Sequence, residues 1–337
     1  AAFMVNDTTG YIKLSKFSRN TFQEFTEAAD KLRAQGMKRL LFDLRDNTGG
    51  YLDQALLLSN EFLSKGDLVV YMEGLHRDRQ DFKADGRGYL RDIQVSVLID
   101  EVSASSSEIF AGAIQDNDRG VIVGRRSFGK GLVQEPINFT DGSGIRLTVA
   151  RFHTPSGRCI QKPYGEDYDY DIFERYASGE MVSADSMKVD TTAVYYTKKG
   201  RPVYGGGGII PDVFVPIDTT KATDFFIRCN KKATTMRFAS AMFDKYKAVL
   251  PTIDDFSRLE RYFDEIALDQ QFLDFAARVD GIRPAPGEWE ESREYMMPQI
   301  NALVGRYSKL DEEAFYRFYL PVDETIKTAL QNTSVIE

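Results

Sequence analysis

The first half of the chain alternates between strand patterns and helix patterns, and few folds accommodate that alternation. Helix patterns cover residues 21–35, 52–63 and 105–115, and they fall between short apolar runs. The runs that read as strands are Tyr11–Phe17, Arg39–Asp43, Leu68–Met72, Val95–Ile99, Val121–Val123 and Ile145–Phe152. Strands joined by helices of this length indicate right-handed βαβ crossovers. The sequence therefore predicts an α/β core with a mainly parallel sheet.

The pattern changes twice further along the chain. The charged stretch at residues 76–87 reads as a solvated loop, and residues 160–215 as loops and short strands that form a β-rich rim. Beyond Thr220 the pattern is helical, over Asp224–Tyr246, Ile253–Ile266, Gln270–Val279 and Ser292–Lys309. We therefore predict two domains, an α/β core over residues 1–218 and an all-helical C-terminal extension over residues 219–337.

Charge and composition exclude several classes of protein. The formal net charge is −8 and the pI about 5.1, whereas a nucleic-acid-binding protein needs a basic surface. No run of roughly 18 apolar residues is long enough to span a bilayer. Cys159 and Cys229 are too few for a disulfide framework or a thiolate metal site, and they could either pair or remain free.

A serine-rich junction carries the first candidate chemistry. Ser105 follows a predicted buried strand and precedes a helix, where the helix dipole and free N–H groups can stabilise a developing oxyanion. The plainer interpretation is a serine that only caps the helix.

A serine nucleophile needs a base, and the chain has only two histidines. His76 lies in the charged stretch and His153 ends a predicted strand, so a Ser–His–Asp triad around His153 is the weaker alternative. A lysine can act instead when burial lowers the pKa of its amine. Lys130 is a suitable candidate, because it lies between Gly129 and Gly131 in the loop after the next strand.

The segment SASSSEIFAGAIQD…VIVGRRSFGKGLVQ resembles the active-site stretch of the carboxyl-terminal processing proteases, also called tail-specific proteases. The resemblance implies that Ser105 is the nucleophile, Lys130 the general base and Gln134 a supporting amide. Ser106 departs mildly from the family, in which alanine is common. The implied fold is an α/β, ClpP/crotonase-like ββα-type core. The implied activity is a serine endopeptidase that cleaves protein substrates near their C-termini through an acyl-enzyme.

A second motif, Asp43-Leu-Arg-Asp-Asn-Thr-Gly-Gly50, resembles the family's DLRxNxGG loop. The resemblance implies that Gly49 or Gly50 supplies one N–H of the oxyanion hole, and the backbone of Ala104–Ser106, chiefly Ser106, the other. From the residues alone, the same motif is also compatible with a tight turn before a helix. The stretches at residues 154–158 and 207–212 resemble two further landmarks, so the resemblance covers about residues 10–215.

The resemblance also implies partners and a setting. Relatives usually carry a PDZ domain before the core, and nothing before Tyr11 could hold one, so we expect that domain to be missing from this chain. The implied partners are protein or peptide substrates, and the implied compartment is extracytoplasmic in a bacterium, in the periplasm or cell envelope. No cofactor or metal is expected.

Three other functions can be compared with parts of the sequence, which argue against two of them. Residues 124–131 are nearly a P-loop, but Gly131 stands where Ser or Thr must hold Mg²⁺, which argues against nucleotide binding. Two distant histidines and no HExxH motif argue against a zinc peptidase. A degenerate member that only binds extended peptides remains open.

Overall fold

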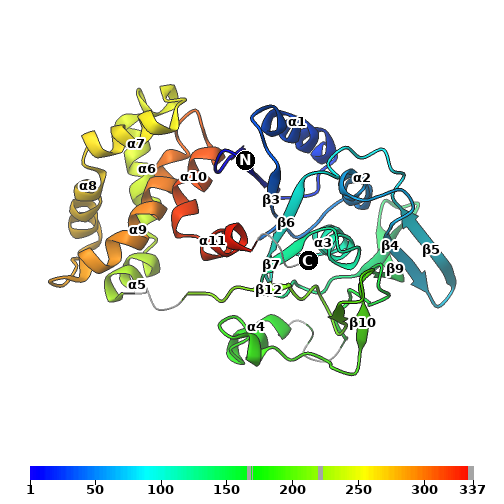
Figure 1. Cartoon of the computed structure of the whole chain (residues 1–337). Helices are drawn as coiled ribbons and strands as arrows, with labels where there is room; N and C mark the ends of the chain where they lie inside the picture. The colour runs from blue at the N-terminus through cyan, green and yellow to red at the C-terminus, as the bar shows by residue number, and fades with distance from the viewer. Residues whose placement is uncertain (165–167, 169, 219–222, 333–337) are drawn as a thin grey trace. The chain divides into compact units, whose positions relative to one another are not determined.

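The computed structural model describes residues 1–164, 168, 170–218 and 223–332. The chain divides into two compact units, one containing Ala2–Ile217 and the other Asp218–Lys327, and the end of the chain from Thr328 groups with the first (Figure 1). The predicted boundary between residues 218 and 219 adjoins residues 219–222, which lie outside the described part, so it stays a prediction.

A six-stranded sheet forms the centre of the first unit. Its strand order is β1-β2-β3-β6-β7-β12, and every neighbouring pair is parallel except β1–β2. The strands are β1 (Ala2–Met4), β2 (Thr9–Lys13), β3 (Arg39–Asp43), β6 (Gln94–Ile99), β7 (Val121–Gly124) and β12 (Val213–Phe214). Because crossovers cover a parallel sheet, strands β2 and β3 are buried along their whole length.

Three helices pack their aromatic side chains together against one face of this sheet. They are α1 (Thr21–Ala34), α2 (Leu52–Phe62) and α3 (Ser106–Asp116). Phe42 of β3 contacts Phe25 of α1 and Phe110 of α3, with ring centroids 5.3 and 5.0 Å apart. Phe62 of α2 also contacts the ring of Phe110. This cluster of edge-on rings fixes α3, and therefore the residues at its N-terminus, over the carboxyl ends of the strands.

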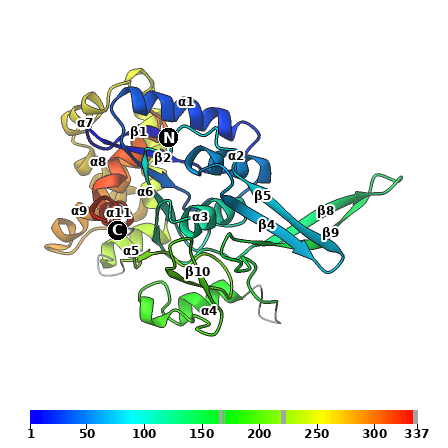
Figure 2. The ribbon, with the colours of Figure 1, turned by 45° about the vertical axis from the view of Figure 1, so that its right-hand side comes forward.

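A second, antiparallel sheet has the strand order β5-β4-β9-β8. Its strands are β4 (Leu68–Gly74), β5 (Arg77–Lys83), β8 (Leu132–Asn138) and β9 (Gly144–His153). Val70 and Phe152 join the core of the first unit, whereas the hairpin of β8 and β9 extends away from it (Figure 2). Because the hairpin begins directly after Lys130, it continues the loop that carries the predicted base.

Short elements form the rim, namely α4 (Asp171–Ala177), a 3₁₀ turn at Ala184–Ser186, β10 (Val194–Tyr196) and β11 (Pro202–Tyr204). The other unit is helical and has its own aromatic core, which includes Phe225, Phe238 and Phe272. Its helices are α5 (Asp224–Lys231), α6 (Thr234–Tyr246), α7 (Phe256–Glu265), α8 (Leu268–Phe275) with a π turn at Ala276–Asp280, α9 (Glu288–Gly305) and α10 (Glu312–Tyr319), with 3₁₀ turns at Leu250–Thr252 and Leu320–Val322. Helix α11 (Glu324–Gln331) ends the described chain.

The predicted α/β class, with its β-rich rim and all-helical C-terminal extension, is confirmed. Two local predictions were wrong. The charged stretch from residue 76 forms strand β5, because pairing with β4 stabilises a segment whose charged side chains remain in solvent. The predicted helix over Asp224–Tyr246 is two helices, broken at Ala233, which has a φ of +51°.

Two properties of the side chains complete the description. Cys159 and Cys229 are both free thiols. Within the described residues, no helix has the length and apolar character needed to cross a bilayer.

Candidate active site

Three loops meet at the carboxyl edge of the parallel sheet. They follow β3, β6 and β7, and they comprise residues 44–51, 100–105 and 125–131. Because neighbouring parallel strands end at the same edge, the topology brings together three segments that are far apart in the sequence. These loops contain every residue predicted for the site except Ser106, which opens α3, and Gln134 on β8.

Ser105 occupies a strained turn between β6 and α3. Its φ is +57° and its ψ −114°, which is rare for a residue with a Cβ, whereas an ordinary N-cap serine has extended backbone angles. Serine capping alone does not explain this geometry. Strain of this kind persists only where surrounding contacts hold it in place.

Glu108 provides those contacts. Its carboxylate is fully buried, and Oε2 accepts hydrogen bonds from the backbone N–H groups of Ser105 and Lys130, each at 2.8 Å. Oε1 accepts from the Gly129 N–H and the Ser127 hydroxyl, each at 2.6 Å. One side chain therefore ties the serine turn to the loop that carries Lys130.

This shared oxygen limits how far apart the two candidate residues lie. The backbone nitrogens of Ser105 and Lys130 both lie 2.8 Å from Glu108 Oε2, so they are separated by no more than twice that distance. A lysine side chain on four methylenes is long enough to reach a hydroxyl on a residue placed so close. In the described part of the chain, however, no hydrogen bond joins the two side chains, and the Lys130 side chain is exposed to solvent.

Burial dominates the electrostatics of Glu108. Complete burial raises the pKa of this carboxyl, and the hydrogen bonds from Ser127, Lys130, Gly129 and Ser105 oppose that shift. An ionised Glu108 accepts all four donors, whereas a protonated one must present a donor to one of them. The anchoring of both loops therefore depends on the charge of this group.

The glycine loop after β3 lies against the serine turn. A Cβ on Gly49 would lie 2.6 Å from the carbonyl oxygen of Ala104 and 2.7 Å from Ser105 Cβ, so only glycine fits there. The Gly49 N–H donates to Asn47 Oδ1 at 2.8 Å, so it is already used. The Ser106 hydroxyl donates to the Gly50 carbonyl at 3.0 Å, which holds these two predicted oxyanion-hole residues together.

Two predicted oxyanion donors are unengaged. Among the described residues, no protein acceptor takes the N–H of Gly50 or that of Ser106. Of the two glycines that the resemblance implied, Gly50 is therefore the better placed.

A buried charged cluster holds the start of the glycine loop. Asp43 at the end of β3 accepts the Tyr11 hydroxyl at 2.7 Å and an Arg45 guanidinium N–H at 2.6 Å, and it also pairs with Lys13. Burial alone would raise the pKa of Asp43, but Arg45, Lys13 and the hydrogen bonds lower it below its usual range. Asp43 is therefore a stabilising anion and not a proton donor at neutral pH.

The remaining candidates lie apart from Ser105. Gln134 is exposed on β8 and donates to the Thr148 hydroxyl at 3.4 Å, so its supporting role stays a prediction. The ring of His153 stacks on Tyr71, and its Nδ1 lies 3.3 Å from the Gly157 carbonyl oxygen. His76 is exposed in the turn between β4 and β5. Neither histidine hydrogen-bonds Ser105 in the described part of the chain, so the alternative triad has no geometric support.

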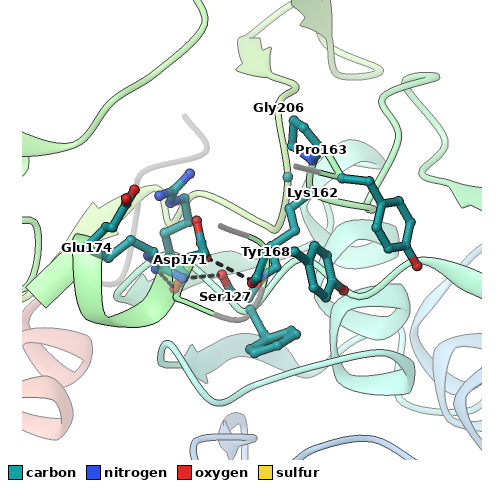
Figure 3. A pocket seen from close by; sticks show the side chains of 12 residues that line it. Ser127, Lys162, Pro163, Tyr168, Asp171, Glu174 and Gly206 are labelled. Carbon is teal, nitrogen blue, oxygen red and sulfur yellow. Dashed lines mark hydrogen bonds and ion pairs between the residues drawn. The ribbon is translucent and has the colours of Figure 1, made fainter. Parts of the chain in front are cut away.

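A polar pocket borders the loop that carries Lys130 on the side of α4. Figure 3 shows its lining, and its volume is about 250 Å³. Lys162 lies in this lining with its ammonium 4.5 Å from the Phe128 ring centre, 4.4 Å from that of Tyr168 and 3.1 Å from Asp171. The backbone N–H of Lys162 also donates to the Gly129 carbonyl. Lys162 thus provides a second contact, besides those of Glu108, to the loop at residues 125–131.

The residue patterns did not indicate the roles of Glu108, Asn47 and Asp100. Glu108 lies in the quoted serine motif, and its position three residues after Ser105 is that of a capping box, which was the available signal. Most donors to Glu108 and Asp100 are backbone N–H groups. Since every residue except proline has one, no residue type marks these partners in a sequence.

Comparison with known proteins finds a family model and several proteins that are similar to this chain. The family model described as peptidase family S41 matches residues 8–172. A probable CtpA-like serine protease of Staphylococcus epidermidis is 39% identical over 153 residues, which are 45% of this chain and 31% of the relative. A carboxyl-terminal-processing protease of Synechocystis is 39% identical over 155 residues, 46% of this chain and 36% of the relative.

A solved structure is also similar to this chain. It is a photosystem II D1 C-terminal processing protease, with 28% identity, a TM-score of 0.46, and coverage of 62% of this chain and 42% of that one. The predicted landmark at residues 207–212 lies outside the residues that the family model matches. Residues 8–172, just under half of the chain, are therefore similar to peptidase family S41.

Proposed function

We propose that this chain is the catalytic part of a serine endopeptidase that uses a Ser105–Lys130 dyad and cleaves protein substrates near their C-termini. The observation that carries the proposal is the shared contact with Glu108 Oε2, which places the backbone of Lys130 beside a serine at positive φ. The similar proteins carry names of serine and carboxyl-terminal-processing proteases, and the matched segments cover only about a third of their length.

The proposed reaction is acyl transfer to water. Neutral Lys130 accepts the proton of the Ser105 hydroxyl, and the resulting alkoxide attacks the scissile carbonyl carbon. The N–H groups of Gly50 and Ser106 stabilise the oxyanion, and Lys130 returns the proton to the leaving amine. Lys130 then takes a proton from water, which attacks the acyl-enzyme carbonyl, and returns this proton to the Ser105 oxygen as the ester bond breaks.

The exposed position of the Lys130 side chain sets one requirement. A solvated ammonium is a poor base at neutral pH, so the side chain must turn toward Ser105 and lose water when substrate binds. A bound polypeptide supplies the apolar cover for that step. We propose that Gln134 then orients the amine, as the family resemblance implies. The extracytoplasmic setting is part of the same proposal.

Active-site labelling and turnover test the dyad. We expect wild-type protein to cleave casein and react with a fluorophosphonate probe, and Ser105→Ala and Lys130→Ala to lose at least about 10³-fold in rate while remaining folded. Lys231→Ala, a change at an exposed lysine of α5, is the matched control and should keep full activity. Near-normal turnover by Lys130→Ala would refute the dyad, and peptide binding without turnover in wild type would favour the non-catalytic scaffold.

A further inference from the structure

Asp100, at the carboxyl end of β6, lies between the two loops that hold the proposed oxyanion donors. It is 5% exposed, and its carboxylate accepts three backbone N–H groups and the Ser103 hydroxyl. Oδ1 accepts from Val102 at 3.1 Å and from Ser103 at 3.0 Å, both in its own loop. The Asp46 N–H, from the glycine loop, lies 3.1 Å from both carboxylate oxygens.

The hydrogen bond from the Asp46 N–H to Asp100 joins the glycine loop to the loop at residues 100–105, at a residue with a strained backbone. Asp46 has a φ of +58°, and the next residue, Asn47, accepts the Ala104 N–H at 3.0 Å through its carbonyl oxygen. The side chain of Asn47 accepts the Gly49 N–H. A shift of Asp46 would therefore be passed along the chain to the glycines and to the residue before Ser105.

We propose that Asp100 is a positioning residue for the reaction. By fixing Asp46 against the loop at residues 100–105, it sets the spacing between the N–H groups of Gly50 and Ser106. The kinetic part of this inference rests on the proposed function, whereas the structural part does not. Asp100 does not touch the reacting atoms. It acts through the backbone of the two loops, and a displacement of about 1 Å in such a site costs about 10²-fold in rate.

The surroundings of Asp100 oppose ionisation of its carboxyl group. Burial, followed by the charges of Asp46 and Glu101, raises the pKa of Asp100, and Arg125 opposes the shift while pairing directly with Glu101. A group with a raised carboxyl pKa is less easily ionised in the folded protein than in the unfolded chain. A neutral amide at position 100 should therefore impair catalysis without lowering the melting temperature by more than a few degrees.

The variant Asp100→Asn weakens one contact between the two loops selectively. An asparagine with its oxygen at the Oδ1 position keeps the bonds to Val102 and Ser103, but of the two acceptor oxygens near the Asp46 N–H only one remains, and an NH₂ group replaces the other. Asp100→Ala removes all of these bonds. Glu61→Gln is the matched control, because Glu61 is also 5% exposed and accepts a backbone N–H, that of Tyr89, away from the three loops.

The experiment combines amide hydrogen exchange with kinetics on the full chain. In Asp100→Asn we expect at least tenfold faster exchange at Asp46, unchanged exchange at Val102 and Ser103, a fall of about 10²-fold in kcat and a KM within twofold. Glu61→Gln should keep the wild-type kcat. Unchanged exchange at Asp46 would overturn the contact, and faster exchange with an unchanged kcat would overturn its role in catalysis.

Failure of the proposed function would look different. If wild-type protein and Ser105→Ala were equally inactive, the peptidase assignment would fall and with it the kinetic part of this inference. The exchange rates at Asp46 would still decide whether Asp100 joins the two loops.

Discussion

Replacing Glu108 with Gln should separate Ser105 from Lys130 at nearly constant side-chain volume. A carboxylate offers two acceptor oxygens, and in this protein each accepts two donors. An amide offers one oxygen, so its NH₂ group must face one of the two donor pairs. The variant therefore changes hydrogen bonding without opening a cavity.

The two orientations of the amide differ in cost. An NH₂ group in place of Oε2 would oppose two backbone N–H groups, those of Ser105 and Lys130. An NH₂ group in place of Oε1 opposes only the Gly129 N–H, because the Ser127 hydroxyl can reverse and accept, as it already does from the Ile209 N–H. We expect the second orientation, with a loss of about 2–4 kcal/mol for one orphaned buried donor and the weaker neutral bonds.

The alanine variant sets the upper limit. Glu108→Ala leaves all four donors without their acceptor, which costs about 4–8 kcal/mol if no water enters. Since the whole folded state is worth only about 5–15 kcal/mol, the loop at residues 125–131 should open locally before the core does.

Urea denaturation and fluorophosphonate labelling measure these effects. We expect the Glu108→Gln variant to lose about 2–4 kcal/mol in the free energy of unfolding and about 10²-fold in labelling rate at Ser105. The control Glu61→Gln should label at the wild-type rate. A Glu108→Gln variant with wild-type stability and labelling would show that Glu108 does not anchor the two loops.

Three further substitutions test the same geometry. Gly49→Ala should lose several kcal/mol in urea denaturation and most of its turnover, because its Cβ would overlap the Ala104 carbonyl oxygen at positive φ. Asp43 stabilises the fold above the usual pKa of an aspartate, and this contribution is lost as pH falls through its lowered folded pKa. An Asp43→Asn variant should therefore unfold more easily at neutral pH and show a flatter acid-unfolding curve by circular dichroism. The Ser105→Gly variant should have a free energy of unfolding about 1 kcal/mol higher than that of Ser105→Ala, because glycine tolerates a φ of +57°. A lower value for the glycine variant would argue against backbone strain at this position.

Helices and strands could be predicted where their burial leaves a regular pattern of apolar residues in the sequence. Strand β3 and helix α2 combine buried apolar residues with a clear period, and their predicted bounds differ from the observed ones by at most one residue. Strand β5 shows the limit, because most of its side chains are exposed and only its pairing with β4 makes it a strand. Helix α4 has seven residues, too few to show a helical period.

The candidate site was predictable in its residue types but not in its connections. The serine motif and the glycine-flanked lysine mark Ser105 and Lys130 as candidates because side-chain chemistry is visible in a sequence. The contact that brings them together runs through Glu108 to backbone N–H groups up to 22 residues away. The orientation of the Lys130 side chain depends on solvent and substrate, and neither is encoded in the spacing of residues.

The strain at Ser105 explains why so many polar contacts converge on these loops. A non-glycine residue at positive φ costs about 1–3 kcal/mol, which a helix N-cap does not require. The Ser105 N–H bond to Glu108 and the Ala104 N–H bond to Asn47 hold the turn on both sides of this strain. Both contacts are made by backbone N–H groups, so the network fixes the backbone of the turn on either side of Ser105.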